Sequence, residues 1–142
     1  MAEDLDQRAD DQDAHRHRAV WLLLWAAAIV YLGTGVFMAL APGSFAEHVA
    51  GYPRVDDHVI RDLGTWSLAT GAALALAALR PAWRRPVLAL AIVQGALHTA
   101  NHVADVGDTD PGYLGPLNVA VVGGGTLALA YVWWAVRRER TR

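Results

Sequence analysis

The sequence contains no cysteine and no lysine, and charged residues fill only 18% of its 142 positions. The absence of cysteine excludes disulfide scaffolds, thiolate zinc sites and cysteine nucleophiles. Soluble domains carry about 25% charged residues, so this chain has little material for a hydrated surface. Its formal net charge of −2 leaves no basic face for nucleic acid. Hydrophobic residues make up 54%, which favours a small helical membrane protein.

Four long apolar runs follow one another along the chain. We expect helices at residues 19–41, 60–79, 86–105 and 113–136. About 20 helical residues cross the apolar core of a bilayer. A chain in lipid must also satisfy its own backbone hydrogen bonds, which favours helices over isolated strands. The sequence therefore predicts an all-α fold, an integral membrane four-helix bundle spanning residues 19–136.

The arginines are distributed unevenly between the two sides of this bundle. One side holds Arg54 and Arg61, and the other holds Arg8, Arg16, Arg18, Arg80, Arg84, Arg85, Arg137, Arg138, Arg140 and Arg142. An excess of positive charge marks the cytoplasmic side, so both termini are predicted to be cytoplasmic. The acidic segment 1–18 is expected to be a disordered tail, and residues 137–142 a basic tail. An aromatic belt is expected at the same interface from Trp21, Trp25, Trp83, Trp133 and Trp134.

The third span carries a polar stripe on an otherwise apolar helix. Its members are Gln94, His98, Asn101, His102 and Asp105, at i, i+4, i+7, i+8 and i+11. At about 100° per residue they occupy roughly a third of the helix circumference. Ionisable residues inside a span indicate a functional site. This stripe is therefore the leading candidate.

Residues of the other helices can be placed at the same depth by counting the rise along each span. His98 lies about 18 Å and His102 about 24 Å from the inner end of their helix, and Thr34 about 22 Å along the first helix. The count predicts a pocket in the outer half of the membrane. We expect the primary contacts to be His98, His102, Asp62 and Asp105. Their orientation is expected to depend on Thr34, Thr65, Asn101, Asn118, Arg61 and Gln94.

Three interpretations of this polar set remain open. Two imidazoles at i and i+4 with a carboxylate could hold a divalent transition metal such as Zn, Fe or Mn. The same residues could bind a small polar ligand or a lipid headgroup, with the histidines as hydrogen-bonding groups or proton carriers. They could also form a hydrogen-bonded network that joins the helices.

Two roles of other classes are alternatives to ligand binding. The chain could be a structural or accessory subunit that packs against a larger membrane complex through the glycines at 123–125, or could form a homodimer. It could also be an enzyme that modifies a lipid or quinone at the outer leaflet. No haem is expected, because His98 and His102 share one helix face and cannot ligate both sides of one iron. No nucleotide is expected either, because the glycine run lacks the phosphate-loop pattern.

Three segments of the chain form a distinctive set: LAPGSFAEHV, VIRDLGTWSLATGAALALAA and HTANHVAD. They resemble small actinobacterial four-helix integral membrane proteins of the DoxX-like group, and the likeness covers about residues 20–135. The resemblance implies a four-helix bundle in the bacterial cytoplasmic membrane with both ends inside. The matching positions are Arg61, Asp62, Gly64, His98 and His102, and Asp105 stands where relatives often have a further histidine.

Overall fold

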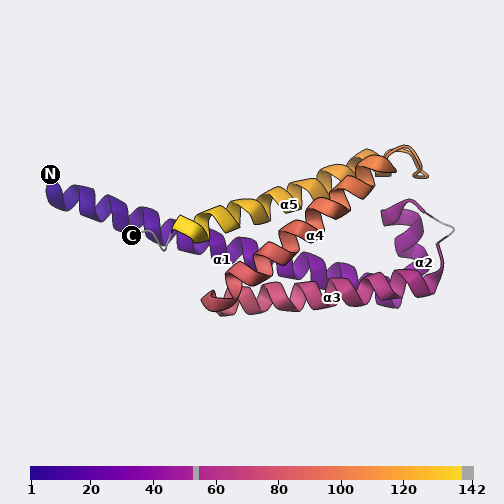
Figure 1. Ribbon diagram of the computed structural model, residues 1–142, viewed down its shortest axis with the longest axis horizontal. Helices are drawn as coiled ribbons and strands as arrows, with labels where there is room; N and C mark the ends of the chain where they lie inside the picture. The colour runs from indigo at the N-terminus through magenta and orange to yellow at the C-terminus, as the bar shows by residue number, and fades with distance from the viewer. Residues whose placement is uncertain (53–54, 139–142) are drawn as a thin grey trace.

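The computed structural model describes residues 1–52 and 55–138, without the side chains of residues 2–6, 9, 10 and 138. Arg54 and residues 139–142 of the predicted basic tail lie outside the described residues. The described chain is helical and contains no strand. Its elements are α1 (Ala2–Leu40), α2 (Pro42–Phe45), the π-helical turn η1 (Ala46–Ala50), α3 (Asp57–Leu79), the 3-10 turn η2 (Pro81–Trp83), α4 (Arg84–Ala104) and α5 (Leu114–Arg138) (Figure 1).

Four helices of the described chain are long and apolar enough to cross a membrane. The candidate spans are Asp11–Leu40, Asp57–Leu79, Pro81–Ala104 and Leu114–Arg137. Their outward faces are strongly apolar, since Leu40, Leu97 and Leu127 are 80%, 65% and 72% exposed. A monomeric soluble protein rarely exposes so much contiguous apolar surface, whereas lipid covers it at no cost. The predicted all-α membrane bundle is confirmed.

Helix boundaries follow the local sequence. α1 ends at Leu40, and Pro42 begins α2 at a position where its missing N–H is not needed. Asp56 caps α3, because its side chain accepts a 2.7 Å hydrogen bond from the His58 backbone N–H. α1 begins and α5 ends toward the same end of the bundle (Figure 1). That this end faces the cytoplasm stays a prediction.

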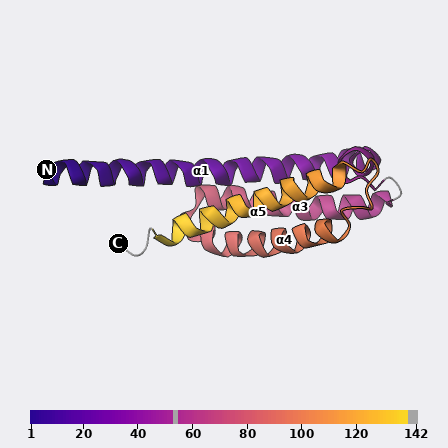
Figure 2. The same ribbon diagram turned by 90° about the horizontal axis from the view of Figure 1, so that it is seen from above.

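The structure differs from the sequence prediction in the first 18 residues. α1 continues back to Ala2, so the segment expected to be a disordered tail is helical and projects beyond the other helices (Figure 2). An ion pair joins Arg16 to Asp13, and the His17 ring is hydrogen-bonded to the Asp13 carbonyl oxygen at 2.8 Å. A formed apolar helix removes the nucleation cost for residues that precede it, which composition alone does not reveal.

Small residues bring α1 and α3 into close contact. A Cβ atom on Gly35 would lie 2.9 Å from the Gly64 carbonyl oxygen, and one on Gly71 would lie 3.1 Å from the Ala28 carbonyl oxygen. Ser67 adds a 2.8 Å hydrogen bond from its hydroxyl to the Tyr31 carbonyl oxygen. Helices in lipid associate through such small-residue contacts and interhelical hydrogen bonds. These contacts make α1 and α3 one antiparallel pair.

α4 and α5 form the second pair in the same way. A Cβ on Gly95 would collide with the Thr126 hydroxyl, and one on Gly123 would lie 3.3 Å from the Thr99 methyl group. A Cβ on Gly124 or Gly125 would meet no atom within 4 Å, so these two glycines do not serve this contact. Of the three glycines at 123–125, Gly123 is therefore the one that allows α5 to pack closely against α4.

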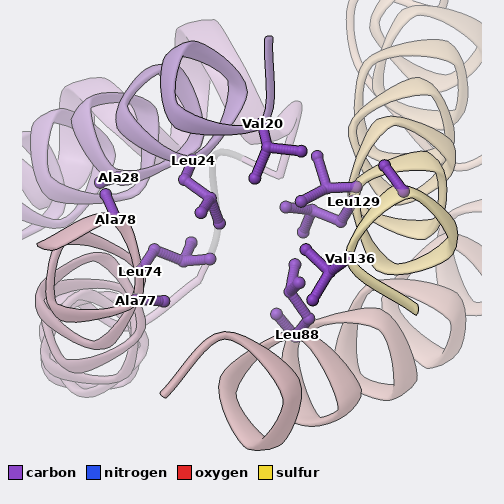
Figure 3. Packing of buried hydrophobic residues seen from close by; sticks show 12 residues of the cluster. Val20, Leu24, Ala28, Leu74, Ala77, Ala78, Leu88, Leu129 and Val136 are labelled. Atoms are coloured by element: carbon purple, nitrogen blue, oxygen red, sulfur yellow. The ribbon is translucent and has the colours of Figure 1, made fainter. Parts of the chain in front are cut away.

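The two pairs share a core at one end, which we call the arginine end because it includes Arg80, Arg84 and Arg85. There the side chains of all four long helices point toward one another, with Val20, Leu24, Leu74, Leu88 and Val132 fully buried (Figure 3). Toward the opposite end, which holds the α1–α3 and α4–α5 connections and is called the loop end, α4 diverges from α3 (Figure 1). This divergence decides which polar residues meet.

Candidate functional site

His98 and His102 form an imidazole pair on consecutive turns of α4. Their ring centroids lie 4.6 Å apart in an edge-to-face arrangement with an interplanar angle of 66°. His98 is exposed and His102 is half-buried. Within the part of the chain that the structure describes, no protein group is hydrogen-bonded to either imidazole. Four ring nitrogens are thus available to an external group.

Asp105 extends this row at the loop end. It follows the last residue of α4 as the C-cap, and its backbone N–H donates to the Asn101 carbonyl oxygen at 3.0 Å. Its carboxylate interacts electrostatically with the neighbouring His102. It also acts on Tyr52, where partial burial and the negative charges of Asp105 and Asp108 raise the pKa of the phenol. The sequence-predicted members His98, His102 and Asp105 therefore lie along one edge of α4.

Asp62 and Arg61 have partners on their own helix. The Asp62 carboxylate lies 3.5 Å from Nε2 of His58, and Arg61 lies 3.6 Å from the Asp57 carboxylate. Both pairs are exposed and follow the i, i+4 spacing of α3. Across the described residues, no group of three His, Asp or Glu side chains is arranged to hold a metal ion. The depth count put Asp62 level with His98, but depth does not measure the lateral separation of diverging helices.

Two of the residues expected to orient the histidines instead join helices and loops. The Tyr31 hydroxyl donates a 3.2 Å hydrogen bond to Oε1 of Gln94, which links α1 to α4. Nδ2 of Asn118 donates to the carbonyl oxygens of Val49 at 3.0 Å and Ala50 at 3.4 Å, which ties η1 to α5. For these two side chains the structural-network interpretation describes the geometry.

The remaining three expected residues do not contact the imidazoles through hydrogen bonds. Thr65 donates its hydroxyl to the Asp62 carbonyl oxygen of its own helix at 2.7 Å. Asn101 is exposed next to His102, and Thr34 is half-buried on α1. Asn101 is the one member of this group on the same helix edge as the histidine pair.

The loop end is closed by backbone contacts that the sequence did not predict. Gly51 adopts the left-handed conformation with φ of 78°, and its carbonyl oxygen accepts from the Asp110 N–H at 3.0 Å. A Cβ on Gly51 would lie 2.9 Å from Thr109. The Thr109 hydroxyl in turn accepts from the Gly115 N–H at 2.9 Å. These contacts hold the two connections together beyond the end of α4.

An open groove of about 130 Å³ runs between α3 and α4. It is lined by Trp66, Ala69, Thr70, Ala73, Val87, Leu90, Ala91 and Gln94. Gln94 and His98 are four residues apart, so His98 continues the stripe of α4 that lines the groove. Trp66 is half exposed and lies away from the other tryptophans in the sequence. A tryptophan outside the predicted aromatic belt is a sequence feature that could have indicated the groove, and the sequence analysis did not use it.

Comparison of the chain with protein families, with characterised proteins and with solved structures finds no match. The DoxX-like resemblance therefore stays an expectation carried by the short motifs quoted above.

Proposed function

We propose that this multi-pass membrane protein binds a small amphipathic molecule taken up from the bilayer. The polar part of that molecule would contact His98 and His102, and its apolar part would lie in the groove between α3 and α4. The observation that carries the proposal is the pair of membrane-embedded imidazoles without a protein hydrogen-bond partner in the described chain. Polar groups in a bilayer are costly to leave unsatisfied.

The chemistry of two adjacent imidazoles fits such a ligand. A neutral imidazole offers one N–H donor and one acceptor nitrogen. Two rings with centroids 4.6 Å apart can therefore donate to a carbonyl or phosphate oxygen and accept from a hydroxyl of the same ligand. Asp105, at the exposed end of the row, would favour a ligand with a cationic or hydrogen-bond-donating group.

The groove supports the apolar half of the proposal. Its walls are mostly alanine, valine and leucine, with the Trp66 indole at one side. Gln94 lies at the junction between these walls and the imidazole pair, and its amide is held by Tyr31. Ligand sites commonly combine an apolar wall with a few oriented polar groups. Along α4, the stripe from Val87 through Gln94 to His98 combines these two features, with apolar side chains first and polar side chains after them.

A divalent transition metal is less well supported by the same geometry. Two imidazoles would supply two ligands, while structural and catalytic zinc sites use three or four from the protein. Asp105 is near His102, but no three-residue metal group forms within the described residues. Zinc, iron or manganese would have to complete its coordination with water or with the bound molecule. Metal binding is therefore an outcome that the experiment must distinguish.

The experiment is identification of what the purified protein retains. Wild type, the double variant His98→Ala/His102→Ala and the control His58→Ala are extracted in the same mild detergent, then analysed by mass spectrometry and elemental analysis. His58 is a matched control because it is exposed on α3 and pairs with Asp62. We expect one organic molecule in wild type and control that the double variant lacks. The same content in all three folded proteins would contradict the proposal. A metal that is present in wild type and control but absent from the double variant would show that the ligand is a metal ion and not an organic molecule.

A second candidate function is that of an accessory subunit in a larger membrane complex. It is favoured by the outward face of α5, where a Cβ on Gly124 or Gly125 would meet no atom within 4 Å. Glycine on an open face allows another helix to approach closely. Gly124→Leu should then abolish co-purification with a partner protein, while the histidine variants should leave it intact. Unchanged co-purification of Gly124→Leu would rule this role out.

A further inference from the structure

The first two arginines of α4 are unusually shielded from solvent. Arg84 is only 9% exposed, and its Nε donates to the Ala77 carbonyl oxygen of α3 at 3.3 Å. Arg85 is half-buried, and its Nε is shielded from solvent without a hydrogen-bond partner in the described residues. Arginine is rarely buried unless it is paired. The Nε–H group of Arg85 therefore lacks an acceptor among the described residues, and an external group could supply one.

The contacts between α1 and α3 bring two more arginines to the same level. Gly71 of α3 lies against Ala28 of α1 in an antiparallel arrangement. Arg80 lies nine residues after Gly71 along α3. Nine residues before Ala28 along α1 is position 19, which is next to Arg18. Equal rise along both helices places Arg80 level with Arg18. Both side chains are exposed.

The contacts between α4 and α5 add a fifth arginine at this level. Gly95 of α4 lies against Thr126 of α5. Arg84 lies eleven residues before Gly95 and Arg137 lies eleven residues after Thr126, so equal rise along the two helices places these arginines level with each other. We define the arginine collar as Arg18, Arg80, Arg84, Arg85 and Arg137. Among the described residues, α4 and α5 carry no acidic side chain, and those of α3, Asp57 and Asp62, lie at the loop end; Glu139 lies outside the described residues. On α1, the carboxylate of Asp13 is held by Arg16.

Tryptophans mark the collar as lying at a membrane interface. Trp21, Trp83 and Trp134 are 47%, 50% and 47% exposed and come from three different helices or turns at the arginine end. Indole rings concentrate where the acyl chains meet the headgroups. The collar therefore lies at the depth expected for lipid phosphates.

We propose that the arginine collar, centred on Arg85, is a binding site for the phosphate of an anionic phospholipid. A guanidinium presents parallel N–H donors that match two oxygens of a phosphate. Basic groups between membrane helices recognise anionic headgroups in this way. The acyl chains of the bound lipid would cover the exposed apolar surface next to Trp83. This site is at the opposite end of the bundle from the imidazole pair and is independent of it.

Lipid selectivity can be measured by quenching of tryptophan fluorescence in vesicles. The full chain is reconstituted in vesicles of fixed phosphatidylcholine and phosphatidylglycerol content, in which either lipid carries brominated acyl chains. We expect brominated phosphatidylglycerol to quench more strongly. Because one arginine near the surface contributes about 1 kcal/mol, Arg85→Gln should lower the relative affinity for phosphatidylglycerol about five-fold. Arg61→Gln, an exposed arginine paired with Asp57 at the loop end, should leave it unchanged.

Further variants keep this test decisive. Arg80→Gln changes an exposed side chain and serves if Arg85→Gln loses helicity; it should also weaken the preference for phosphatidylglycerol. Equal quenching by both lipids in wild type would overturn the proposal, as would collar variants that behave like Arg61→Gln. Excess inorganic phosphate is added in a separate arm. If it removes the preference completely, the site binds free phosphate and the lipid proposal is wrong.

Discussion

The Tyr31 hydroxyl on α1 donates a 3.2 Å hydrogen bond to Oε1 of Gln94 on α4, across the boundary between the two helix pairs. Gln94 also lines the groove between α3 and α4. The same amide thus connects the helix pairs and borders the proposed ligand site. A change that breaks this bond should affect both stability and binding.

The strength of this connection can be measured with a double-mutant cycle. Tyr31→Phe and Gln94→Leu each remove one partner, and the double variant removes both. Hydrogen bonds between membrane helices contribute about 0.6 kcal/mol on average, so we expect a coupling free energy of that size. The measurement is the free energy of unfolding in mixed micelles of mild detergent and dodecyl sulfate. Fully additive effects would show that the hydrogen bond does not stabilise the bundle.

Glycine spacing in α1 predicts a sharp difference between two neighbouring positions. A Cβ on Gly35 would lie 2.7 Å from Leu68 and 2.9 Å from the Gly64 carbonyl oxygen, whereas one on Gly33 would meet nothing within 4 Å. Gly35→Leu should therefore lower stability by about 1–3 kcal/mol, as overpacking does. Gly33→Leu should change it little. Thermal unfolding in detergent compares the two, and equal losses would mean that α1 and α3 do not pack as described.

Explicit signals in the sequence mark the ends of the first two long helices. Pro42 and the Arg80–Pro81 step lie within one or two residues of the observed ends of α1 and α3. The extension of α1 to Ala2 was missed, because an acidic segment gives no local sign that a following apolar helix will propagate into it.

The candidate site was predictable along α4 and much less so between helices. The row of Gln94, His98, His102 and Asp105 follows from helical periodicity. Whether Asp62 joins it depends on the angle between α3 and α4, which is set by contacts between the two helix pairs, such as the buried core that includes Leu74 and Leu88. Asn118 illustrates the same point, since its bonds to η1 depend on a loop conformation that periodicity does not encode.

The absence of cysteine makes the predicted orientation directly testable. Single substitutions Ser44→Cys at the loop end and Ala82→Cys at the arginine end are both on exposed residues. The excess of arginine predicts that the arginine end is cytoplasmic. In intact cells a membrane-impermeant maleimide should label Ser44→Cys, and it should label Ala82→Cys only after lysis. The reverse pattern would invert the topology and move the imidazole pair to the inner half of the membrane.

Tyr52 predicts how stability responds to alkaline pH. Partial burial and the charges of Asp105 and Asp108 raise its pKa above the ordinary value of about 10. Between that ordinary value and the raised pKa, the phenol is ionised in the unfolded chain and still protonated in the folded chain. This contribution to stability is therefore complete below about pH 10 and is lost as the pH rises toward the raised pKa. Unfolding of wild type and Tyr52→Phe is compared across this range. Parallel pH profiles would contradict the described position of Tyr52.

Contact between an external molecule and the imidazole pair is tested most directly by histidine-selective NMR. Spectra of the protein in mild detergent are recorded before and after organic extraction and refolding. Resonances are assigned with His98→Ala, His102→Ala and His58→Ala. We predict that the His98 and His102 signals shift on extraction while the His58 signal stays in place. Unchanged His98 and His102 signals in a folded, extracted protein would contradict the proposed function.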